Sequence, residues 1–192
     1  MVKIYSSKSQ ELQPATIDDA TLLQIGKLIR ATAEIEDLVT LYICNLAEIN
    51  ASKAVILLGR TAVTRRLEIA EYLASMIGPH VTQLHKDNFN AVFGEVLSCR
   101  NAVAHGVLMG IDSGGRYAFL TSKTAETTVA SAIQIVESYL PSDIKEFARV
   151  AEESIPILET NLKLRPLRAE RLRRPLAPHR KGLHQGKKDE KP

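Results

Sequence analysis

The chain has no Trp, only two cysteines (Cys44 and Cys99) and no long apolar run. Two cysteines are too few for a disulfide framework, so a reducing compartment such as the cytoplasm is the simplest expectation. No stretch approaches the ~18 apolar residues of a transmembrane helix, and the N-terminus lacks the apolar segment of a secretory signal. At 192 residues the chain is short for a (β/α)₈ barrel, although it can bury a genuine core.

The charge of the chain is concentrated at one end. Residues 165–192 carry ten Lys/Arg and three Asp/Glu, whereas the whole chain has a net charge of only +3. This segment is also rich in proline and poor in large apolar residues, so it cannot bury enough surface to fold alone. We therefore expect a helical domain over residues 1–164 and a basic, disordered tail over 165–192. The tail is interpreted either as an arm that attracts RNA or another polyanion, or as a solubilising segment.

Apolar residues recur at steps of three and four through most of the chain, which is the period of amphipathic helices. One segment breaks this period, because Ser113-Gly114-Gly115 separates two short strand-like runs. The sequence therefore predicts an all-α protein, an antiparallel helical bundle with a small β-hairpin after the third helix. The expected helices span about 17–49, 52–77, 87–104, 125–140 and 144–158, and the hairpin strands span 107–112 and 116–122.

The most informative residues lie at the end of the third predicted helix. Arg100 falls on the same helical arc as Phe93 and Val96, and an arginine on an apolar stripe needs a partner because burying an unpaired guanidinium is too costly. Asn101 and His105 are four residues apart and therefore share a face. The helix thus ends with a permanent cation, an amide and an imidazole, followed by a candidate C-cap at Gly106.

These residue types suit phosphodiester chemistry. Histidine can both accept and donate a proton near neutral pH, and its charged form is favoured at a helix C-terminus. Arginine presents a planar fork that matches phosphate oxygens and stabilises developing negative charge. No carboxylate cluster accompanies the set, so we expect neither a metal nor another cofactor.

The pattern Arg100-Asn101-x-x-x-His105, placed at the end of a helix after earlier long helices, resembles the signature of HEPN domains. The resemblance covers about residues 17–140. It implies a helical bundle that acts as a homodimer, with the motifs of two copies forming one shared site. It also implies a metal-independent endoribonuclease of a toxin, defence or RNA-processing system, in some cases with an antitoxin or regulatory partner. Arg100 and His105 would be catalytic, Asn101 would orient them or the phosphate, and cleavage would leave a 2′,3′-cyclic phosphate.

Spacing alone does not carry this resemblance. Arg174 and His179 have the same spacing, but Pro175 and Pro178 between them exclude a regular helix. The alternative hypothesis is a non-catalytic RNA-binding or interaction module, in which Arg100 pairs with an acid on the first helix and ties the bundle together. The candidate acids are Glu34, Glu36 and Asp37.

Other chemistry-bearing residues have simpler interpretations beside the functional ones. The pair His80 and His85 with Asp87 could suggest a metal site, but a solvated loop fits better. Cys99 could be a reactive thiol beside a cation, although cysteine is more often a small buried hydrophobe. Three arginines on the second predicted helix could contact an RNA backbone or could form a solvated face; these are Arg60, Arg65 and Arg66.

Overall fold

Five helices and three strands make up the described part of the chain. The computed structural model describes residues 12–59, 61–79, 84–124 and 132–164, together with 166 and 168. In chain order the elements are α1 (Asp19–Leu46), α2 (Ala51–Leu58), α3 (Val63–Ile77), α4 (Lys86–His105), β1 (Val107–Ile111), β2 (Tyr117–Thr124), β3 (Ala132–Tyr139) and α5 (Pro141–Asn161). The mostly helical character predicted from the sequence is confirmed.

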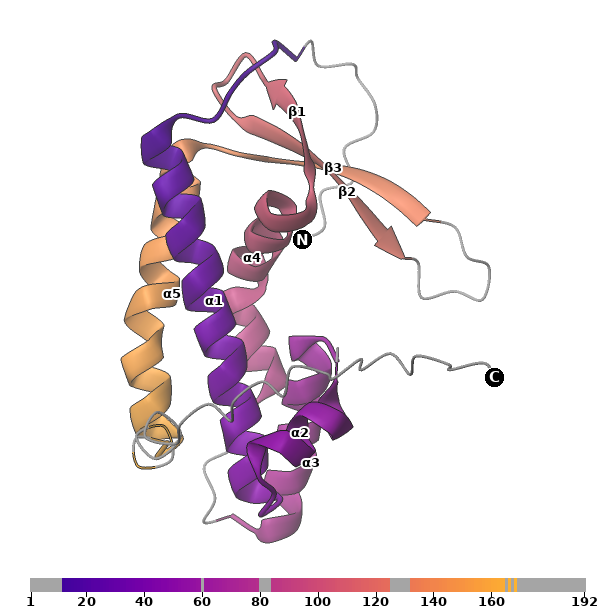
Figure 1. Cartoon of the computed structure of the whole chain (residues 1–192), viewed down its shortest axis with the longest axis vertical. Helices are drawn as coiled ribbons and strands as arrows, with labels where there is room; N and C mark the ends of the chain where they lie inside the picture. The colour runs from indigo at the N-terminus through magenta and orange to yellow at the C-terminus, as the bar shows by residue number, and fades with distance from the viewer. Residues whose placement is uncertain are drawn as a thin grey trace, which may run out of the picture.

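The three long helices lie side by side (Figure 1). α1 and α5 run in the same direction and contact each other along most of their length, while α4 runs in the opposite direction against both. The two shorter helices α2 and α3 gather around the C-terminal half of α1. α1 and α5 are parallel because the chain returns over the sheet before it enters α5, so a purely antiparallel order does not hold.

The strands form an antiparallel sheet in the order β1-β2-β3, near the end of α4 (Figure 1). The predicted helix over residues 125–140 is wrong for residues 132–139, because β3 pairs with β2 from Tyr117↔Tyr139 to Thr124↔Ala132. Residues 125–131 of that prediction lie outside the described part of the chain. The segment can satisfy either period, since its β-branched residues also alternate through Ile133 and Ile135. Pairing with β2 decides the outcome, because without β3 the backbone groups along one side of β2 would lack partners.

α1 supplies the centre of the core. Its apolar stripe includes Leu28, Ile35, Leu38 and Val39, each at most 1% exposed, and it packs against buried residues of α3, α4 and α5. None of the described helices combines the length and the apolar character needed to cross a membrane. α1 therefore fixes the positions of the helices that surround it, including α4.

The N-terminus of α1 is tied to the sheet by its capping residue. Asp18 accepts hydrogen bonds from Thr21 N at 2.9 Å and Thr21 Oγ1 at 2.7 Å, and from the hydroxyl of Tyr117 on β2 at 3.1 Å. These bonds stabilise the carboxylate, so the pKa of Asp18 lies below its ordinary value, mainly because of Thr21. Asp18 thus joins a helix cap to a strand through one ionised group.

We expect the free energy of unfolding of Asp18→Asn to fall less steeply than that of the wild type as the pH is lowered. A carboxyl whose pKa is lowered in the folded state contributes stability above its unfolded pKa of about 4, and this contribution is lost as the pH falls through the folded value. Denaturant midpoints measured from pH 6 to pH 2 should therefore fall less steeply for the variant than for the wild type. Tyr117→Phe, which removes one donor, should change the slope in the same direction by less. Equal slopes in all three proteins would contradict this role for Asp18.

The start of the basic C-terminal segment is docked on the helices. Arg168 forms ion pairs with Glu34 on α1 and Glu159 on α5, and its backbone N–H donates to Leu164 O at 3.0 Å. The rest of the predicted disordered tail lies outside the described residues. Arg168, four residues beyond the predicted boundary at residue 164, is thus attached to the helices.

Candidate functional site

The last two turns of α4 carry the three predicted site residues. The helix ends at His105, and Gly106 follows as its C-cap, with its N–H donating to Ala102 O at 2.8 Å. From Val107 the chain continues directly as β1. His105 therefore lies at the junction between helix and sheet, where the backbone is held from both sides.

Arg100 turns toward α1 and not toward open solvent. Its side chain is 19% exposed, and Nη2 lies 2.5 Å from Oε1 of Glu36, whose side chain is 24% exposed. Nη1 donates to Asn101 Oδ1 at 2.8 Å. The partner that the sequence requires for this arginine is thus Glu36, one of the three acids proposed for it, and the pair ties α4 to α1.

Asn101 and His105 lie on the exposed side of α4, as expected from their spacing. Within the described ranges, the imidazole of His105 has no hydrogen bond or ion pair. Residues five apart on a helix are separated by roughly 140° around the axis and about 7.5 Å along it. One chain therefore presents the guanidinium of Arg100 and the imidazole of His105 to different sides, and only Arg100 and Asn101 are in direct contact.

Cys99, the neighbour of Arg100, is a buried hydrophobe. It is fully inaccessible, and burial, with smaller contributions from Asp143 and Glu137, raises the pKa of its thiol to about 12. A thiol with so high a pKa supplies almost no thiolate near neutral pH. The reactive-thiol interpretation of Cys99 is therefore wrong.

A polar contact on another side of α4 escaped the sequence analysis. Glu137 on β3 accepts hydrogen bonds from Ser98 Oγ at 2.7 Å and from Thr121 Oγ1 of β2 at 3.4 Å. The contact was missed because residues 125–140 were predicted as a helix. Strand alternation, which places Glu137 on the same face as Ile135, was the signal that could have found it. These bonds hold α4 against the sheet just before the site begins.

The histidines before α4 do not form a metal site in the described part of the chain. His85 Nδ1 lies 2.9 Å from Glu71 Oε1, and this hydrogen bond lowers the pKa of Glu71. Asp87 lies in the first turn of α4, and His80 is outside the described residues. No three His, Cys, Asp or Glu side chains among the residues with described positions are grouped so that they could hold a metal ion. His85 thus joins α3 to the start of α4.

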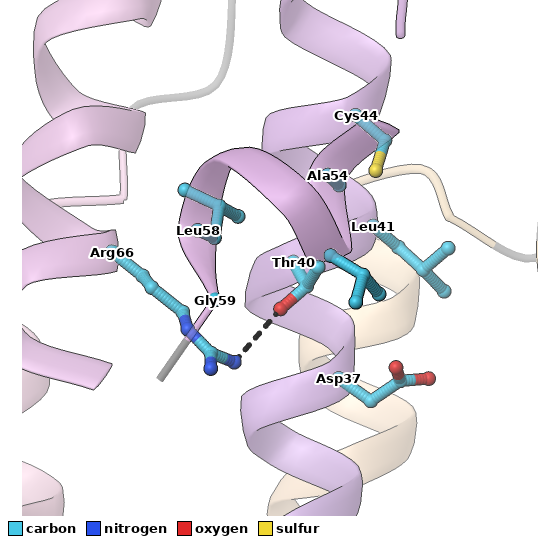
Figure 2. Close-up of a pocket in the computed structure, with 9 residues that line it drawn as sticks. Asp37, Thr40, Leu41, Cys44, Ala54, Leu58, Gly59 and Arg66 are labelled. Atoms are coloured by element: carbon cyan, nitrogen blue, oxygen red, sulfur yellow. Dashed lines mark hydrogen bonds between the residues drawn. The ribbon is translucent and has the colours of Figure 1, made fainter. Parts of the chain in front are cut away.

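Arg65 and Arg66, two of the three arginines proposed on the second predicted helix, bond to other side chains of the fold. Arg65 pairs with Glu68 at 2.6 Å, and Arg60 lies outside the described residues. Arg66 borders a cavity of about 140 Å³ between α1, α2 and α3 and donates from Nη1 to Thr40 Oγ1 at 3.1 Å (Figure 2). Its Nε is buried with no hydrogen-bond partner among the described atoms. Figure 2 shows Asp37, which also lines the cavity, turned away from this guanidinium.

Comparison with known proteins finds no match to this chain. No family model matches it, and no curated protein or solved structure is similar enough to count as a relative. Among the described residues, the end of α4 combines an exposed imidazole, that of His105, with an anchored guanidinium, that of Arg100.

Proposed function

We propose that the chain is a metal-independent endoribonuclease of the HEPN type, which cleaves RNA as a homodimer through Arg100, Asn101 and His105. The observation that carries the proposal is the exposed imidazole of His105 at the same helix end as a guanidinium held by a carboxylate and an amide at fixed geometry. A surface histidine and an anchored arginine supply proton transfer and charge stabilisation.

In the proposed reaction the ribose 2′-oxygen attacks the adjacent phosphorus, and the bond from phosphorus to the 5′-oxygen breaks. One imidazole accepts the proton of the 2′-hydroxyl, and a second, protonated imidazole donates a proton to the leaving 5′-oxygen. Arg100 stabilises the negative charge that grows on the phosphate oxygens. The products are a 2′,3′-cyclic phosphate and a 5′-hydroxyl, and all atoms and protons are accounted for without a metal.

The divergence of Arg100 and His105 within one chain favours a shared site. A single copy supplies one imidazole, which points away from its own guanidinium by roughly 140°. A twofold-related copy would bring a second His105 and a second Arg100 to the same phosphate if the axis passes beside the end of α4, because residues near a twofold axis meet their own copies. The homodimer is therefore part of the proposed mechanism.

A second function is favoured by the ion pair itself. In this second function Glu36 neutralises Arg100 inside the same chain, and the pair joins α1 to α4 without taking part in chemistry. The chain would then be a non-catalytic RNA-binding or interaction module. The two functions differ in whether RNA is cut and in whether the cut depends on His105.

We expect the purified chain to cut RNA in the presence of EDTA and to leave 2′,3′-cyclic phosphate ends. Substrates with 2′-O-methyl ribose at the cleaved positions should resist, because they lack the attacking hydroxyl. Product ends can be assigned by mass spectrometry. Arg100→Ala should lower cleavage strongly, whereas Arg30→Ala should not, although Arg30 also pairs with an acid of another helix, Glu152, at 2.6 Å. Cleavage that EDTA abolishes, products with 5′-phosphates or no cleavage of any RNA would contradict the proposal.

A further inference from the structure

The residue that fixes Arg100 lies on another helix. Glu36 is in the middle of α1, one position after the fully buried Ile35, and its carboxylate reaches across to α4. It is therefore carried by the most deeply packed element of the fold. A carboxylate on such an element has little freedom to follow a moving partner.

Two hydrogen bonds fix the plane of the Arg100 guanidinium. Glu36 binds Nη2 from α1, and Asn101 accepts from Nη1 within α4. A guanidinium is planar, so contacts at both terminal nitrogens define its orientation and leave the remaining N–H groups aimed in set directions. Asn101 alone supplies one contact from the same helix, and Glu36 supplies the contact from outside it.

The pair is better shielded from solvent than most ion pairs among the described residues. The arginine of the Arg30–Glu152 pair is 66% exposed, compared with 19% for Arg100. Exposed pairs are screened by water and salt and restrict their partners little. The Glu36–Arg100 pair is less accessible, so Coulomb attraction and the hydrogen bond hold the guanidinium more firmly.

We infer that Glu36 is a positioning residue for Arg100 in RNA cleavage, an inference that rests on the proposed function. Its carboxylate does not touch the reacting atoms, because it is occupied by Nη2. It acts by presenting the guanidinium in one orientation to the phosphate, so that no reorganisation is needed when charge develops there.

Glu34 provides a matched control on the same helix. Its side chain is 25% exposed, nearly the same as that of Glu36, and it also pairs with an arginine of a distant segment, Arg168. Two positions on a helix differ by roughly 200°, so Glu34 faces α5 while Glu36 faces α4. The two glutamates thus differ in which arginine they hold and hardly at all in burial or charge.

We expect Glu36→Ala to lower kcat for RNA cleavage by about 10- to 100-fold with little change in KM, as for misorientation of a catalytic group. Glu36→Gln keeps an oxygen acceptor, so its kcat should stay within a few-fold of the wild-type value. The kcat of Glu34→Ala should equal that of the wild type. In the Arg100→Ala background, Glu36→Ala should cause no further loss, because the residue acts only through Arg100. Steady-state kinetics on a single RNA in EDTA give all of these values.

A second measurement follows the guanidinium directly. The ¹⁵N order parameter of Arg100 Nε should be high in the wild type and should fall below about 0.6 in Glu36→Ala, the range of flexible groups. Equal kcat in Glu36→Ala and Glu34→Ala, or a further loss in the Arg100→Ala background, would overturn the inference while the ribonuclease function stands. A mobile Arg100 in the wild type would overturn it as well. If the wild type cuts no RNA, the ribonuclease proposal fails, and the inference about cleavage fails with it.

Discussion

His105→Ala is expected to lower kcat for RNA cleavage by about 10²- to 10⁴-fold, the range that a general acid–base group contributes. The loss should appear in kcat and not in stability, because the side chain is exposed and makes no hydrogen bond with any described residue. Thermal unfolding of the variant should therefore match that of the wild type, since surface substitutions usually change the free energy of unfolding by less than about 0.5 kcal/mol.

The control for this variant is His85→Ala at the other end of α4. His85 is also exposed, but it is bonded to Glu71, so its loss should leave cleavage unchanged. A shared site adds a mixing test. Because both imidazoles of a dimer act in one reaction, adding His105→Ala protein should lower cleavage below that of the same amount of wild type alone, since a mixed dimer keeps only one imidazole. Equal cleavage by the wild type and His105→Ala would remove the imidazole from the mechanism, and unchanged wild-type cleavage after subunit exchange would contradict the shared site.

Gly106→Ala is expected to lower the free energy of unfolding by about 2–3 kcal/mol, in the range of overpacked sites. A Cβ at this position would lie 2.4 Å from the carbonyl oxygen of Ala102 and 3.1 Å from both Phe119 Cβ and Thr121 Cγ2. The nearest of these atoms is backbone and cannot rotate away, so the last turn of α4 must shift. For a domain of this size the midpoint of thermal unfolding should fall by about 4–12 °C. Cleavage should fall too, because the displaced turn carries His105.

The matched substitution in the interior of the same helix should have the opposite sign. A Cβ on Gly94 would meet no atom within 4 Å, and alanine is favoured over glycine inside a helix. Gly94→Ala should therefore raise the free energy of unfolding by about 0.5–1 kcal/mol. Guanidinium titrations of the three proteins test both substitutions. A change of the same sign in both variants would show that close approach at Gly106 does not govern the effect.

The helical part of the fold was predictable because its cause is local. The apolar stripe of α1 specifies a long helix, and the structure contains it within three residues at each end of the predicted span. β3 was not predictable in the same way. Its residues fit two periods, and the choice depends on a hydrogen-bonded neighbour that single-segment patterns do not include.

The candidate site was predictable in its members but not in its arrangement. The position of Arg100 on the apolar arc of α4 predicted an acidic partner, and the first helix had three candidates. Only the packing of α1 against α4 selects Glu36 among them. The exposed face shared by Asn101 and His105 followed directly from their spacing. By contrast, the contact of Glu137 with Ser98 depends on the sheet, so no argument from helix periodicity could reach it.

The anchoring of Arg168 has a practical consequence for where the chain can be cut. Glu34 on α1 and Glu159 on α5 both bind this one guanidinium. Removing everything after residue 164 would therefore leave two neighbouring carboxylates that repel each other between the two helices. A shortened chain that ends beyond Arg168 keeps this arginine as the partner of both carboxylates and lacks most of the basic segment. Truncation there separates the contribution of the tail to polyanion binding from any effect on the packing of α1, the helix that carries Glu36.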